Sequence, residues 1–198
     1  MDSQKMGLEE NAAEILYLAG VRLLSEGKGE KALQRLEKAS EIYTRKGLKP
    51  NIAKCYKQMG NVYAFYEEWD KAEACYQKAI ELEKELKNWP SLLENLFLMS
   101  NLLMDNNELD RSLEYAREAE KFSKKVGDER NQFQSLKQMG LIYERKMDSK
   151  KAKESFEKAL KIGEKLELQE TEIIAREILG ILQRKAEIEK RSKNNKTD

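Results

Sequence analysis

Small residues recur along this chain at a fixed spacing of forty positions. The first set consists of Gly20, Gly60, Ser100, Gly140 and Gly180. Further small residues follow the first four of these markers by twelve and by nineteen positions: Ala32, Ala72, Ser112 and Ala152, then Ala39, Ala79, Ala119 and Ala159. A period of this length, with small residues at constant offsets, indicates a stacked array of repeats rather than one globular core.

Each period contains two apolar stripes at helical spacing. In the second period Ile52, Tyr56 and Met59 recur at three- and four-residue steps, and a second stripe follows the turn sequence EEWD. Pro50 and Pro90 lie forty residues apart and suit the first position of a helix. We therefore predict an all-α protein with nine helices: four antiparallel pairs and one unpaired C-terminal helix.

This pattern predicts a right-handed α-solenoid with defined segments. The expected segments are a short N-terminal extension (1–10), an array (11–191) with repeats at 11–49, 50–89, 90–129 and 130–168 and a capping helix at 169–191, and a disordered polar tail (192–198). The small markers are expected where helices cross closely. Bulky residues sixteen positions later, namely Leu36, Tyr76 and Phe156, are expected to fill the space beside them, with Ala116 as the exception.

Composition excludes several function classes. The chain has 198 residues, with 37 basic and 36 acidic side chains, so it lacks the basic excess of a nucleic-acid-binding module. It has no histidine, which removes the commonest general base and a leading metal ligand. The cysteines Cys55 and Cys75 form no CxxC pair and suit a reducing compartment. We expect a cytoplasmic protein that is not an enzyme, without cofactor, metal, small-molecule substrate, nucleic-acid partner or membrane span.

The repeat motif resembles that of the tetratricopeptide repeat, here in a long-helix form of about forty residues. The second repeat carries the motif at Tyr56, Met59, Gly60, Tyr63, Ala72, Tyr76 and Ala79, and the fourth at Leu136, Met139, Gly140, Tyr143, Ala152, Phe156 and Ala159. The third repeat departs from it at Ser100, Ser112 and Ala116. The resemblance implies a non-catalytic scaffold whose first helices line a groove that binds another protein.

The residues expected to line the groove can be inferred from their fixed offsets to the marker residues. The candidate residues for binding a peptide are Tyr17, Lys54, Lys57, Asn61, Phe65, Phe97, Asn101, Met104, Lys137 and Arg145. The asparagines repeat at one offset, and a primary amide can both donate to and accept from a peptide backbone. The cations favour an acidic partner, and the aromatic residues are candidate apolar anchors. Alternatively, the asparagines follow the repeat consensus, the cations are solvated, and Phe65 and Phe97 pack between helices.

Two further alternatives concern partners. The carboxylate-clamp form of the family, which binds chaperone tails, is disfavoured because Leu98, Gln134 and Gln138 stand where it needs Asn, Lys and Arg. On the last helix, Ile174, Ile178 and Ile181 form a stripe expected to face the groove as a partner or dimer contact, unless the C-terminal end covers it. Ile173, Leu179 and Leu182 are expected to pack on the fourth pair. The leading hypothesis is therefore a scaffold that binds a peptide or amphipathic helix, and the alternative is a homo-oligomer formed through terminal apolar faces.

Overall fold

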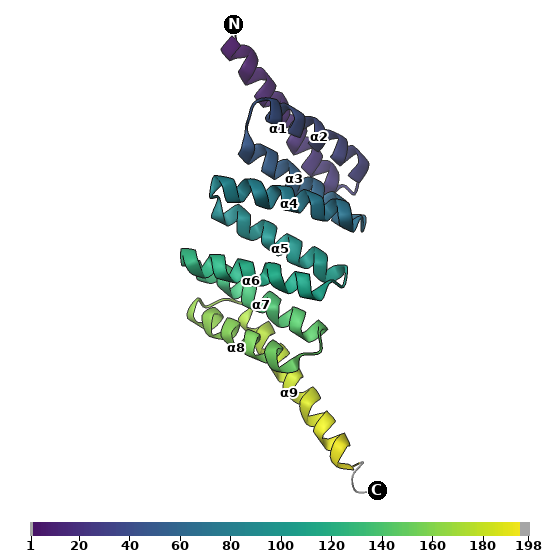
Figure 1. Cartoon of the computed structure of the whole chain (residues 1–198), viewed down its shortest axis with the longest axis vertical. Coiled ribbons are helices and arrows are strands. Elements are labelled where there is room, and N and C mark those ends of the chain that lie inside the picture. The colour runs from purple at the N-terminus through teal and green to yellow at the C-terminus, as the bar shows by residue number, and fades with distance from the viewer. Residues whose placement is uncertain (1, 195–198) are drawn as a thin grey trace. The chain divides into compact units, whose positions relative to one another are not determined.

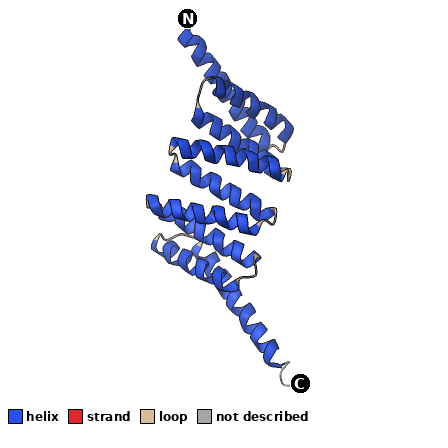
Figure 2. Ribbon diagram, in the orientation of Figure 1, coloured by secondary structure: helices blue, strands red, loops and turns tan. Residues whose placement is uncertain are grey.

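The computed structural model describes the backbone of residues 2–194, together with the side chains of residues 7–184 and of Glu187. Within these residues the chain forms nine α-helices and no β-strand (Figures 1 and 2). The helices are α1 (Asp2–Ser25), α2 (Gly29–Arg45), α3 (Lys49–Phe65), α4 (Trp69–Leu86), α5 (Trp89–Asp105), α6 (Leu109–Val126), α7 (Glu129–Arg145), α8 (Ser149–Lys165) and α9 (Thr171–Asn194). The predicted all-α fold is confirmed.

The chain divides into two compact units, which we describe separately. The first unit is Met1–Asn106, with α1 to α5, and the second is Asn107–Asp198, with α6 to α9. In the first unit each helix contacts the next along the chain, and α1 also contacts α3. In the second unit the sequential contacts α6–α7, α7–α8 and α8–α9 hold the helices together.

The marker glycines make the close approach that their spacing predicts. A Cβ added to Gly20 would lie 2.7 Å from Leu36 Cγ, and one added to Gly60 would lie 2.6 Å from Tyr76 Cε1. In the second unit, a Cβ on Gly140 would lie 2.5 Å from the ring of Phe156. Each bulky residue sixteen positions after a marker therefore packs directly on the marker's backbone. Real Cβ atoms essentially never come this close to other atoms, so a larger residue at any of these three positions would force the facing side chain to move.

The turns repeat as regularly as the helices. Residues with positive φ occur every twenty positions, at Gly27, Gly47, Glu67, Lys87, Asn107, Gly127, Met147 and Glu167. Glycine enters this left-handed region without a steric cost, whereas a side chain makes it unfavourable by about 1–2 kcal/mol. Five of the eight positions carry a side chain. The helix packing on either side therefore determines the turn conformation more strongly than the local residue does.

The ends of the chain differ from the predicted segments. Residues 2–10, expected to form a short extension outside the array, belong to α1. At the other end α9 continues to Asn194, so the expected disordered tail overlaps its last turn, and residues 195–198 lie outside the described part of the chain. None of the described helices has the length and apolar character that crossing a membrane requires.

Candidate functional site

The candidate site lies on a face that the first helices of three successive pairs share within the first unit. We call it the polar face, and define it by Tyr17, Lys57, Asn61, Glu94 and Asn95. Tyr17 is on α1, Lys57 and Asn61 are on α3, and Glu94 and Asn95 are on α5. A hydrogen bond between the side chains of Tyr17 and Gln58 joins α1 to α3. The register of the repeat thus brings residues about forty positions apart into one network.

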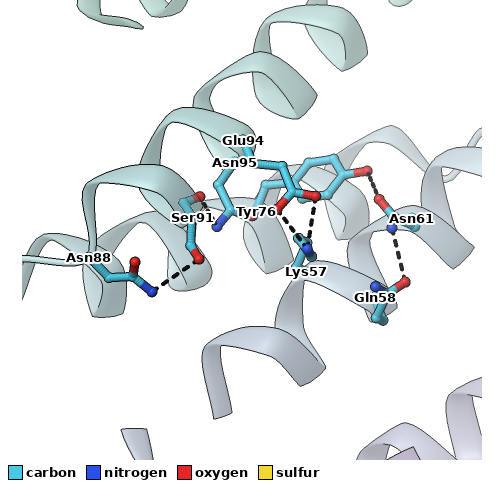
Figure 3. A network of polar contacts seen from close by, with 8 residues as sticks. All are labelled: Lys57, Gln58, Asn61, Tyr76, Asn88, Ser91, Glu94 and Asn95. Atoms are coloured by element: carbon cyan, nitrogen blue, oxygen red, sulfur yellow. Dashed lines mark hydrogen bonds and ion pairs between the residues drawn. The ribbon is translucent and has the colours of Figure 1, made fainter. Parts of the chain in front are cut away.

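An ion pair connects α3 to α5 at the centre of this face. Lys57 Nζ donates to both carboxylate oxygens of Glu94, at 2.9 and 2.8 Å (Figure 3). The side chain of Lys57 is only 18% exposed, whereas that of Glu94 is 53% exposed. The positive charge expected from Lys57 is therefore balanced within the protein. Lys54 lies exposed on the same helix.

Asn61 is held in place by two side chains. Its Oδ1 accepts a hydrogen bond from the Tyr76 hydroxyl at 2.8 Å, and its Nδ2 donates to Gln58 Oε1 at 3.1 Å (Figure 3). Burial raises the pKa of Tyr76, which keeps the hydroxyl protonated and able to donate. These two bonds use half of the capacity of the amide, which has two N–H groups and two lone pairs. The fixed amide can therefore still donate one bond and accept one from a ligand.

A polar pocket of about 150 Å³ lies beside the Lys57–Glu94 pair. Its lining residues come from α1, α3, α4 and α5: Tyr17, Ala53, Lys54, Lys57, Glu83, Ser91 and Asn95. Glu83 and Asn95 are only 3% and 1% exposed. Burial raises the pKa of Glu83, although a hydrogen bond to Asn88 and the charges of Lys57 and Lys54 act in the opposite direction.

Sequence reasoning identified Tyr17, Lys54 and Lys57 in this pocket but missed Glu83, Ser91 and Asn95. A signal for Glu83 was present, because it continues the buried stripe of Tyr76 and Ile80 on α4 at helical spacing. A charged residue on an otherwise apolar stripe marks a buried charge, which needs a partner or a function.

The other predicted residues of the first unit have different environments. Phe65 is 66% exposed and contacts Tyr66 edge to face, with 5.2 Å between the ring centroids. Phe97 and Met104 are half-buried, and Asn101 is exposed. The repeated asparagines thus differ, since Asn61 is half-buried within a network whereas Asn101 lies at the surface.

In the second unit, Lys137 lies over the ring of Phe133, with 5.6 Å from its Nζ to the ring centroid, and Arg145 is exposed. The expected exposure of the α9 stripe is wrong. Ile174 and Ile181 are buried and Ile178 is half-buried, whereas Ile173, Leu179 and Leu182 are exposed. Relative to the marker Gly180, the exposed three correspond to Ala53, Met59 and Val62 of α3, which are buried. On α3, Met59 and Val62 pack with Ala32 and Leu36 of the preceding helix α2, and Leu179 and Leu182 of α9 lack this burial.

The thiols offer no reactive nucleophile. Both cysteines are free, and burial raises the pKa of Cys55 to about 12 and that of Cys75 to about 11. Both groups are therefore protonated at neutral pH, and a thiol is a much weaker nucleophile than a thiolate. Among the described residues, no cluster of cysteine, aspartate and glutamate has an arrangement that could hold a metal ion.

Two family models match the chain. The tetratricopeptide repeat model matches residues 11–85, and the model of the soluble NSF attachment protein, SNAP, matches residues 50–176. No curated protein sequence matches the chain.

Solved structures show the same fold at low sequence identity. The apo form of RapI superposes with a TM-score of 0.82 at 16% identity, over 89% of this chain and 49% of RapI. A Rap protein complexed with Competence and Sporulation Factor gives 0.67 at 14% identity, over 90% and 50%. A putative kinesin light chain with TPR-like repeats from Podosopora anserina gives 0.73 at 13% identity, over 93% and 92%. The chain thus spans about half the length of these Rap proteins.

Proposed function

Since this chain belongs to the tetratricopeptide-type helical repeat proteins, we propose that it is a non-catalytic scaffold that binds a peptide or an amphipathic helix of another protein in a groove lined by its first helices. Proteins of this family are generally interaction scaffolds without catalytic activity. One protein with a similar fold is a Rap protein in complex with Competence and Sporulation Factor. We place the protein in the cytoplasm, because its two free cysteines suit a reducing compartment.

The observation that carries this proposal is the fixed amide of Asn61. A side chain that is already oriented loses little entropy when it binds, so its remaining donor and acceptor are suited to an extended backbone. The exposed ring of Phe65 on the same helix provides an apolar anchor beside this polar contact. The balanced charge of Lys57 removes one reason to expect an acidic partner.

Homo-oligomerisation is the less favoured alternative. It relied on apolar faces at both terminal helices, and burial of Ile174 and Ile181 removes two of the three residues of the stripe on α9. The predicted stripe on α9 therefore gives the self-assembly hypothesis no support.

Affinity capture from cell extract with a paired variant tests the scaffold. Asn61→Ala combined with Lys57→Glu changes the polar face, whereas Lys38→Glu, at an exposed position on α2, is the charge-matched control. We expect the control to retain the proteins captured by the unmodified chain and the paired variant to lose at least one of them. Circular dichroism verifies that both variants remain helical. Identical capture by all three proteins would reject the polar face as the binding surface.

A further inference from the structure

Two residues that line the polar pocket carry acceptor atoms that the protein itself does not satisfy. Glu83 Oε2 and Asn95 Oδ1 are fully buried and accept no hydrogen bond from any described residue. One comes from α4 and the other from α5, and both residues line the same cavity of about 150 Å³. A buried acceptor without a donor is unfavourable, so two in one pocket require an explanation.

The orientation of Asn95 follows from its neighbour. Its Nδ2 donates to the backbone carbonyl of Ser91 at 2.9 Å (Figure 3). A carbonyl only accepts, so the atom facing it must be the nitrogen, and Oδ1 is then directed away from it. The Ser91 hydroxyl in turn accepts from Asn88 Nδ2 at 3.0 Å. The bond to the Ser91 carbonyl therefore fixes Asn95 with its unused oxygen in place.

The charges around the pocket leave Glu83 without a cation in direct contact, although Asn88 forms a hydrogen bond with its carboxylate. The Lys57 ammonium contacts both oxygens of Glu94, so its charge is balanced there. Lys54 lies at the exposed rim, and its charge lowers the pKa of Glu83 without direct contact. Tyr17 provides an aromatic side chain in the pocket wall. The pocket thus combines a buried carboxylate, a buried amide oxygen and an aromatic ring.

We propose that this pocket receives the side chain of an arginine from the bound partner, an inference that rests on the proposed scaffold function. A guanidinium group has several N–H donors in a fixed plane and no acceptor, so it can satisfy acceptors on two helices at once. It is more weakly hydrated than the ammonium of lysine, which favours its burial. Its flat face also stacks on aromatic rings such as that of Tyr17. A neutral amide donor would leave the carboxylate of Glu83 without a counter-charge.

Binding of N-acetyl-arginine amide to the full chain tests the pocket without any partner. The titration is followed by NMR through the side-chain amide resonance of Asn95, with N-acetyl-citrulline amide as the neutral, isosteric comparison. We expect saturable shifts with the arginine compound and at least about tenfold weaker binding of the citrulline compound, because a charged hydrogen bond contributes at least this factor. Equal binding of the two compounds, or no shift with either, would overturn the proposal.

Two variants locate the site. Glu83→Gln is expected to weaken binding of the arginine compound about tenfold. Glu81→Gln, at an exposed position on the same helix, is expected to leave this affinity unchanged. Lys54→Glu adds a negative charge at the exposed rim without altering the core, and is expected to strengthen binding severalfold. An unchanged affinity in both Glu83→Gln and Lys54→Glu contradicts the assignment.

The probe experiment and the capture experiment can fail separately. Loss of capture in the Asn61→Ala, Lys57→Glu variant without binding of the arginine compound supports the scaffold and refutes the arginine pocket. Binding of the arginine compound with unchanged capture shows that the pocket accepts a guanidinium group, but it refutes the polar face as the partner surface and with it the assignment of the arginine to the partner.

Discussion

The second and fourth repeats have the same packing but carry different side chains at the positions predicted to line the groove. Both place an aromatic ring against the marker glycine, Tyr76 on Gly60 and Phe156 on Gly140. In the second repeat the ring also carries a hydroxyl that donates to Asn61. In the fourth repeat Phe156 has no hydroxyl, and Leu141 stands where Asn61 would be. The aromatic ring therefore contributes to the packing in both repeats. The hydroxyl and its hydrogen-bonded amide occur only in the second repeat, so the packing does not depend on them.

The same contrast appears three positions before each marker. Lys57 forms an ion pair with Glu94 of the next first helix. Its counterpart Lys137 lies over the ring of Phe133, and the position equivalent to Glu94 is the buried Ile174. The lysine of the second repeat thus contacts a charged group, and the lysine of the fourth repeat contacts an apolar ring within its own unit. The repeat motif determines the helix packing and leaves the character of the exposed face free to vary.

The shared packing can be tested by filling the space beside the markers. Gly60→Val and Gly140→Val are expected to destabilise the chain by about 3 kcal/mol each, because the added Cβ lies within 2.6 Å of an aromatic ring. Gly180→Val is the control, since its Cβ would approach only the end of Arg184, at 3.4 Å, and we expect a change within about 0.5 kcal/mol. Urea unfolding followed by circular dichroism measures all three. Equal effects at Gly60 and Gly180 would show that ring contact is not what requires glycine.

The polar addition can be tested by exchanging the two aromatic residues. Tyr76→Phe removes the donor to Asn61 and is expected to cost about 1 kcal/mol. Phe156→Tyr introduces a hydroxyl beside Leu141 and is expected to cost about 1–2 kcal/mol, because the new group has no counterpart of Asn61 to bond.

Combining Tyr76→Phe with Asn61→Leu recreates the fourth-repeat pair in the second repeat. We expect the double variant to recover most of the loss, which a double-mutant cycle detects as a coupling energy of about 1 kcal/mol. Strict additivity of the two changes would mean that the hydroxyl and the amide act independently.

The sequence alone was sufficient for the architecture because the packing is periodic and local. A marker glycine and the bulky residue sixteen positions later meet within one helix pair, so one repeat predicts the next, as Gly60–Tyr76 and Gly140–Phe156 show. The turns were harder to predict. The left-handed positions follow a strict spacing, but residues such as Glu67 and Met147 occupy them without a glycine signature.

Predicting the site failed where the repeat rule does not apply. The rule assigns faces on α9 by analogy with α3, but α9 buries a different face from α3, so the assigned and observed exposures of Ile173 and Ile174 are reversed. Glu83 was overlooked because charged residues usually lie in solvent. Its place on the buried stripe of α4 indicated burial, but that pattern does not identify the residues of α3 and α5 that line the pocket with it.

The polar pocket makes the stability of the chain depend on pH through Glu83. Burial raises its pKa in the folded state above the ordinary value of 4.5. The folded chain then holds the proton more tightly than the unfolded chain, so this group favours folding below pH 4.5, and the contribution is lost as the pH rises through the folded pKa. Glu83→Gln removes the buried charge and is expected to raise stability at pH 7 by about 1 kcal/mol.

Urea unfolding at a series of pH values from acid to neutral measures this difference. The stability difference between Glu83→Gln and the unmodified chain should be small below pH 4.5 and should grow as the pH rises. Glu81→Gln is the matched control, because this carboxylate is exposed on the same helix, and its difference should stay nearly constant. A pH-independent difference for Glu83→Gln would show that the charge is not buried in the folded state.

The smallest expected effect distinguishes Lys57 from Lys137, which occupy equivalent positions in the second and fourth repeats. A double-mutant cycle with Lys57→Met and Glu94→Gln is expected to give a coupling energy of about 0.5 kcal/mol, because Glu94 is more than half exposed. Raising the salt concentration to 1 M should reduce this coupling, since it shortens the screening length to about 3 Å. Lys137 contacts an aromatic face instead of a carboxylate, so Lys137→Met should change stability by a similar amount at low and at high salt. Coupling between Lys57 and Glu94 that withstands 1 M salt would indicate a pair shielded from solvent, and would make the polar face a rigid part of the first unit.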